Sequence, residues 1–187
     1  MVKNDVTLNE VIIAGFGGQG ILSMGRLIAY AGLLEDKNVS WLPSYGPEMR
    51  GGTANCAVVV SDELVSSPIL NACNALIVMN GPSLDKFESF VVPGGVIIVD
   101  SSLVTRIPTR TDVKFIQIPA TQLANEAGNK TYAGILLLGA LIGQTNLVTL
   151  DSFEKALKDV LPKKKHFMIP EEMEMLKKGM SFQEMKA

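Results

Sequence analysis

The chain has 187 residues and a formal net charge of −2, with 47% hydrophobic and 19% charged residues. This length fits one domain with at most a short appendage, and the low charged fraction predicts that another protein covers part of its surface. The near-balanced charge argues against nucleic acid as the main partner, and we expect a cytoplasmic protein without a signal peptide or a membrane-spanning helix.

The cysteine and histidine content limits the chemistry. A zinc or iron–sulfur site needs about four soft ligands. The two cysteines, Cys56 and Cys73, stand 17 residues apart without flanking histidines, so we expect buried free thiols and no metal on this chain. The single histidine, His166, lies outside the apolar segments, which argues against a Ser-His-Asp or Cys-His nucleophile system.

The first half of the chain alternates apolar runs with a helical pattern. A β-branched run at residues 10–14 leads into a glycine-rich segment, and a helical pattern follows over 21–34. Further strands are expected at 39–42, 53–60 and 75–79, and the last leads through a turn into a helix ending near residue 90. No helix separates the second and third strands, so the sequence predicts a mixed sheet.

The second half continues this alternation. A turn at residues 93–95 leads into a strand at 96–99, and the last strand is expected at 114–118. The helical patterns cover residues 120–127, 132–143 and 152–161. Short apolar strands between helices are typical of a sheet covered on both faces. The sequence therefore predicts a three-layer α/β/α fold with a mixed, mostly parallel sheet and a Rossmann-like glycine loop after the first strand.

The last residues differ in character, so we expect an α/β domain over residues 1–161 and a C-terminal helical arm over residues 162–187. Pro170 opens a predicted helix with early glutamates and late lysines, and Gly179 is expected just after its end. Five of the nine methionines fall in the arm. Because methionine adapts to many surfaces, the arm is expected either to pack on the core or to dock on a partner.

The glycine-rich segment satisfies the pattern G-x-G-x-x-G with Gly15, Gly17 and Gly20, directly between a strand and a helix. Bare backbone N–H groups and a helix N-terminus suit a phosphate or carboxylate. A dinucleotide site also needs an acidic residue after the second strand, whereas Glu35 and Asp36 precede it. An anion site is thus favoured over NAD binding, and a purely structural tight turn remains an alternative.

The loop SYGPEMRGGTAN, residues 44–55, is the second concentration of polar side chains. In the predicted sheet it leaves the same edge as the glycine segment, where α/β proteins bind ligands, and residues 80–82 leave this edge as well. Arg50 either pairs with Glu48 or offers its planar guanidinium to a carboxylate or phosphate.

Three segments occur in order along the chain and read GFGGQGILSMGRLIAYAG, SYGPEMRGGTANC and ALIVMNGPSLDKF. Together they resemble the gamma subunit of 2-oxoacid:ferredoxin oxidoreductases, with the 2-oxoglutarate and branched-chain members nearest, over residues 11–161. The resemblance implies a multi-subunit enzyme that cleaves a 2-oxoacid with coenzyme A and thiamine diphosphate. The products are an acyl-CoA and carbon dioxide, and iron–sulfur clusters pass the electrons to ferredoxin.

The resemblance also implies a division of labour. Thiamine diphosphate, Mg²⁺ and the clusters are expected on alpha and beta subunits and, where present, on a ferredoxin-like delta subunit. This chain alone is expected to bind no cofactor and to be inactive, while it helps to form the coenzyme A side of a shared cleft; an isolated chain is also able to pair with itself. The residues assigned to this cleft are Gly15, Gly17, Gly18, Gln19, Gly20, Ser44, Tyr45, Glu48, Arg50, Gly51, Gly52, Asn55 and Asn80.

Three other functions stay open at this stage. The small subunit of indolepyruvate ferredoxin oxidoreductase is expected to share this domain with a different substrate. A stand-alone nucleotide-binding protein would use the glycine segment alone. A purely structural subunit would hold its partners together without touching a substrate.

Overall fold

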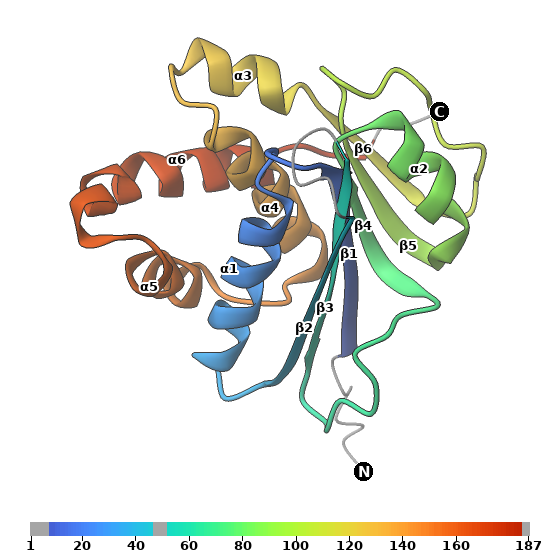
Figure 1. The fold of residues 1–187 in the computed structure, drawn as a ribbon, viewed down its shortest axis with the longest axis horizontal. Helices are drawn as coiled ribbons and strands as arrows, with labels where there is room; N and C mark the ends of the chain where they lie inside the picture. The colour runs from blue at the N-terminus through green and yellow to red at the C-terminus, as the bar shows by residue number, and fades with distance from the viewer. Residues whose placement is uncertain (1–7, 47–51, 185–187) are drawn as a thin grey trace.

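The computed structural model describes residues 8–46 and 52–184, which form a six-stranded sheet with helices on both faces (Figure 1). The strand order is β2-β3-β1-β4-β5-β6. Strand β3 runs antiparallel to both of its neighbours, whereas β1, β4, β5 and β6 are parallel. The predicted α/β class and the mixed, mostly parallel sheet are confirmed.

The expected strands and helices are all present. The strands are β1 (Leu8–Phe16), β2 (Asn38–Tyr45), β3 (Thr53–Ser61), β4 (Cys73–Val78), β5 (Val91–Asp100) and β6 (Lys114–Ile118). The α-helices are α1 (Ile21–Leu33), α2 (Gly81–Phe87), α3 (Ala120–Glu126), α4 (Tyr132–Thr145), α5 (Leu150–Val160) and α6 (Ile169–Met180), and the 3-10 helices are η1 (Glu88–Phe90) and η2 (Lys163–Met168). Some boundaries differ: β2 is longer than the expected 39–42, and the expected turn at 93–95 lies inside β5, where Gly94 has a φ of 79°.

The central strand β1 is buried on both faces, which explains its unbroken apolar run. Its side chains alternate between two cores: Val11 and Ile13 belong to the larger, and Ile12 and Ala14 to the smaller. Helices α1, α4, α5 and α6 lie on one side of the sheet, and α2 lies on the other (Figure 1). Both cysteines are free and buried, as expected, and burial raises the pKa of each thiol to about 12.

Helix α4 is apolar on all sides, because it lies between other elements of the larger core. Every residue from 132 to 142 is buried, which accounts for the long uncharged run in the sequence. Within residues 8–46 and 52–184, none of the helices combines the length and the apolar character that a membrane span requires.

The C-terminal segment packs on the core, as one of the two alternatives for it predicts. A Cβ atom on Gly139 of α4 would lie 2.1 Å from the Leu176 carbonyl oxygen, and one on Gly179 would lie 2.0 Å from that of Leu136. Helices α4 and α6 therefore cross with their backbones in contact. The expectation that Gly179 follows the helix is wrong, because α6 continues to Met180 and Gly179 provides room for this crossing. The domain boundary after residue 161 stays a prediction.

Candidate functional site

The glycine loop between β1 and α1 has a conformation that only glycine adopts easily. Gly18 and Gly20 have φ values of 96° and 80°. The carbonyl oxygen of Gly20 accepts the first helical bond, from the Met24 N–H at 2.9 Å. Within residues 8–46 and 52–184, no side chain caps α1 and its first turn holds no acidic residue, so none of these residues neutralises the positive end of the helix dipole. This end of α1 suits an anion.

Gln19 fixes the glycine loop to the neighbouring strand. Its side-chain oxygen accepts a hydrogen bond from the Phe16 N–H at 2.5 Å, and its amide nitrogen donates to the Met79 carbonyl at 3.1 Å. A Cβ atom on Gly15 would lie 2.5 Å from the Gln19 Oε1 atom. Gly15 therefore makes room for the Gln19 side chain, and both residues hold the loop in shape.

The two predicted loops meet at one edge of the sheet. The Gly17 N–H donates to the Gly52 carbonyl at 2.8 Å, which joins the glycine loop to the end of the SYGPEMRGGTAN loop. Glu48, Arg50 and Gly51 lie outside the described residues. Their assignment to the site stays a prediction.

The other residues of the second loop lie on the two outer strands. Ser44 of β2 pairs with Asn55 of β3, and Tyr45 is exposed at the end of β2. Strand β3 separates β2 from β1, so the end of β2 is two strands away from the glycine loop. In a dinucleotide fold, the acidic ribose ligand ends a strand that follows the first helix and lies beside the first strand. This arrangement removes the usual geometry for NAD.

Asn80 lies at the same edge, because the Met79 N–H donates to the Ala14 carbonyl at 2.9 Å. Its side-chain oxygen accepts the Ser83 N–H at 2.8 Å and thereby caps α2. Asn80 is 2% exposed, and its Nδ2 atom has no hydrogen-bond partner among the described residues. The structure thus gives Asn80 a capping role, away from the solvent.

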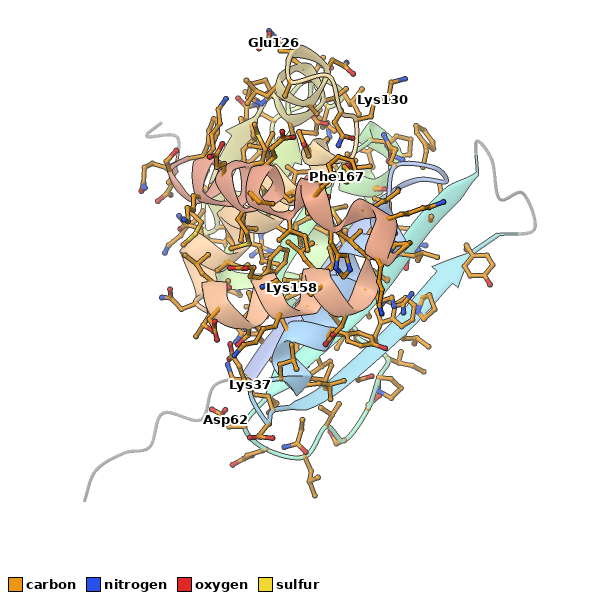
Figure 2. All side chains as sticks on the ribbon, turned by 90° about the vertical axis from the view of Figure 1, so that its left-hand side faces the viewer. Lys37, Asp62, Glu126, Lys130, Lys158 and Phe167 are labelled. Carbon is orange, nitrogen blue, oxygen red and sulfur yellow. The ribbon has the colours of Figure 1, made fainter. Side chains whose placement is uncertain are left out.

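A cavity of about 550 Å³, which sequence reasoning missed, lies beside the glycine loop. Figure 2 looks onto this side of the molecule, where Lys130 and Phe167 are exposed. Gly18, Gln19 and Gly20 line the cavity together with residues of α1, α3, α4, α5, η2 and α6. Its apolar lining includes Met24, Leu27, Leu157, Leu161 and Met168, and its charged lining consists of Lys130, Lys165 and Glu172. This size is in the usual range for small-molecule sites.

Glu172 is the unusual residue of the cavity. It is 3% exposed, and its Oε2 atom has no hydrogen-bond partner among the described residues. Burial raises the pKa of this carboxyl, and the charge of Lys165 offsets part of the rise. The sequence holds one signal for this burial. Glu172 stands four residues before Leu176 and seven before Gly179, which places all three on the same, buried face of α6.

The described residues offer groups for binding rather than for covalent chemistry. Backbone N–H groups, a helix N-terminus and two lysines suit phosphate or carboxylate, and the apolar walls suit an organic body. Across the parts of the chain that the structure describes, no three His, Cys, Asp or Glu side chains lie together as a metal would require.

Comparison with known proteins gives a family match and close relatives. The model of the pyruvate ferredoxin/flavodoxin oxidoreductase family matches residues 10–182. The ketoisovalerate oxidoreductase subunit VorA of Methanothermobacter thermautotrophicus is 42% identical over 151 residues, which make up 80% of this chain and 31% of VorA. The chain thus spans about a third of that relative's length.

Two solved structures share the fold. The gamma subunit of a keto/oxoacid ferredoxin oxidoreductase from Geobacter sulfurreducens has a TM-score of 0.77 and 29% identity, and the match covers 92% of this chain and 98% of that one. The 2-oxoglutarate:ferredoxin oxidoreductase of Magnetococcus marinus, solved with 2-oxoglutarate, coenzyme A and succinyl-CoA, has a TM-score of 0.82 and 25% identity. That match covers 92% of this chain and 30% of that one.

Proposed function

Because the chain belongs to the pyruvate ferredoxin/flavodoxin oxidoreductase family, we propose that it is the gamma subunit of a cytoplasmic, multi-subunit 2-oxoacid:ferredoxin oxidoreductase. The nearly complete match to the Geobacter gamma subunit supports this assignment. In VorA and in the Magnetococcus protein, the matched region makes up 31% and 30% of the chain, respectively.

In this proposal the chain forms the coenzyme A side of the active site. The observation that carries it is the glycine loop, which joins the second loop through the Gly17–Gly52 hydrogen bond and borders a cavity of about 550 Å³. A Cβ atom on Gly18 or Gly20 would meet nothing within 4 Å, so an anion is able to approach these backbone N–H groups closely. The residues present therefore fit coenzyme A.

The two cysteines of the chain do not fit an iron–sulfur cluster. Cys56 and Cys73 are buried thiols whose pKa is raised to about 12, whereas a cluster ligand must be a thiolate. In this proposal, thiamine diphosphate, Mg²⁺ and the iron–sulfur clusters belong to alpha and beta partner subunits, with a ferredoxin-like delta subunit where one exists. The substrate is 2-oxoglutarate or a branched-chain 2-oxoacid, in keeping with the relatives' names.

The proposal is tested by anaerobic affinity purification of the tagged chain from its own source, followed by assays with a panel of 2-oxoacids. Each assay contains coenzyme A and a ferredoxin or viologen acceptor. We expect thiamine- and cluster-bearing chains to co-purify and one 2-oxoacid to be oxidised. If the chain purifies alone and inert, under conditions in which a control oxidoreductase of the same source survives, the proposal is wrong.

Arg50→Ala tests the second loop in the assembled enzyme. We expect a higher KM for coenzyme A or for the 2-oxoacid, because the guanidinium is assigned to a phosphate or a carboxylate. Arg26→Ala is the matched control, since Arg26 is exposed on α1 and lies over the Tyr30 ring. Unchanged kinetics for both substrates would remove Arg50 from the site.

A further inference from the structure

The cavity beside the glycine loop is lined by anion-binding backbone groups, by lysines and by apolar side chains, and this combination indicates the kind of ligand that fits. Gly18, Gly20 and the uncapped start of α1 suit a phosphate, and Lys130 and Lys165 add positive charge on the same cavity. Leucine and methionine side chains from α1, α5 and η2 form apolar walls. A ligand that fits carries phosphate groups at one end and a flat or apolar body at the other.

Glu172 adds a requirement for a hydrogen-bond donor. Its Oε2 atom is buried and unpartnered within the described part of the chain, and the nearby Tyr132 hydroxyl donates to Glu171 instead. A buried acceptor without a partner costs free energy, and an N–H group of a bound ligand offsets that cost. The body of the ligand therefore presents an N–H group to Glu172.

Building on the proposed function, we infer that this cavity receives the adenine end of coenzyme A and that Glu172 accepts a hydrogen bond from the 6-amino group. The thiol end has to leave this chain to react on the partner subunits, so the end enclosed by the helices is the nucleotide. Adenine has apolar faces for the leucine and methionine walls and N–H donors on its edge. Its phosphates then lie toward the glycine loop and the start of α1.

The inference is tested in the assembled enzyme with an analogue of coenzyme A in which hydrogen replaces the 6-amino group. We expect its KM to be about tenfold higher than that of coenzyme A, because the hydrogen bond to a carboxylate is lost. Adenosine 3′,5′-bisphosphate should compete with coenzyme A, and 4′-phosphopantetheine should compete far more weakly.

The variant Glu172→Leu should raise the KM for coenzyme A about tenfold and leave that for the amino-free analogue unchanged, since leucine removes only the acceptor. Glu174→Leu is the matched control, because Glu174 is exposed on the same helix. If Glu172 had only a structural role, the variant Glu172→Leu would instead be less stable, and its KM values for coenzyme A and for the analogue would rise together. If Glu172→Leu fails to fold, the analogue and the two competitors decide the question with the wild-type enzyme.

Equal KM values for coenzyme A and the amino-free analogue in the wild-type enzyme would overturn the inference and leave the proposed function standing. So would stronger competition by 4′-phosphopantetheine than by the bisphosphate. An enzyme that co-purifies with this chain but shows no dependence on coenzyme A would overturn both.

Discussion

Glu35 and Glu172 are two mostly buried carboxylates whose pKa values are shifted in opposite directions. Glu35 lies where the end of α1 meets the start of α5, and it accepts the Thr149 N–H at 2.6 Å and pairs with Lys37 at 3.0 Å. Burial raises its pKa, but hydrogen bonds from Thr149, Ser152 and Lys37 outweigh burial and bring the pKa to about 2. Glu35 therefore has a structural role, and this role explains why an acidic residue stands just before β2.

The surroundings of Glu172 differ from those of Glu35. It is more deeply buried, its Oε2 atom is unpartnered among the described residues, and burial raises its pKa. Native proteins seldom leave a buried polar atom without a hydrogen bond. Glu35 therefore stabilises the fold through its hydrogen bonds, whereas the Oε2 atom of Glu172 is available to accept a hydrogen bond from a ligand in the cavity.

The largest expected effect comes from removing the helix crossing that holds Glu172 in the cavity. In Gly179→Ala, the new methyl group would lie 2.0 Å from the Leu136 carbonyl oxygen, so α6 has to move away from α4. We expect the free energy of unfolding to fall by about 3 kcal/mol or more, measured by urea denaturation. Lys178→Ala, at an exposed position of α6, is the control and should change it little. A normal stability for Gly179→Ala would contradict the backbone contact.

The next effect tests the paired carboxylate. Because the folded pKa of Glu35 lies below its unfolded value of 4.5, its stabilisation is complete above pH 4.5 and is lost as the pH falls toward about 2. We expect Glu35→Gln to destabilise the chain by about 2 kcal/mol at pH 7 and by much less near pH 2. Chemical denaturation of both chains over this pH range measures the difference. A pH-independent difference would show that Glu35 acts without its charge.

A smaller loss of stability is expected from a methyl group in the glycine loop. Gly20→Ala places alanine in a left-handed conformation with free space around its methyl group, so we expect a loss of about 1 to 2 kcal/mol. Gly94→Ala is the matched control, because Gly94 has a similar φ and equally free space inside β5. Thermal denaturation should show similar losses for both variants. A much larger loss for Gly20→Ala would mean that the loop packs more tightly than the structure shows.

The smallest effect tests the unpartnered carboxylate and has the opposite sign. Because the folded pKa of Glu172 is raised, the folded chain holds its proton longer, and stability falls as the pH rises above 4.5. We expect the stability gained by Glu172→Leu to grow as the pH rises above 4.5. Denaturation curves at pH 4 and pH 7 measure this gain. A gain that shrinks with rising pH would contradict the missing partner.

Much of the fold could be predicted from local patterns. The apolar runs of β1, β4 and β5 and the glycine segment before α1 are signals within a few residues, and the strands were found where they were expected. The reversed strand β3 was also predictable, because no helix precedes it. Its insertion between β2 and β1 depends on contacts between distant segments and has no local signal.

The missed features all depend on contacts between helices. Gly179 looks the same in the sequence whether it ends a helix or lets two helices touch, and only α4 on the other side decides between them. Glu172 stands among other glutamates in the first turn of α6, so a favourable interaction with the helix dipole explained it equally well. Its spacing from Leu176 and Gly179 was the one clue to burial, and the cavity forms only where residues of six helices come together.

The most direct test of a coenzyme A role for this chain is the steady-state kinetics of the assembled enzyme with Gly20→Ala, varying coenzyme A and the 2-oxoacid separately. The added methyl group would occupy open space beside the loop, where the proposed ligand approaches the backbone N–H groups. We predict a KM for coenzyme A that is about tenfold higher, with an unchanged KM for the 2-oxoacid and an unchanged result for Gly94→Ala. Full assembly with an unchanged KM for coenzyme A would contradict that role and leave this chain a structural partner.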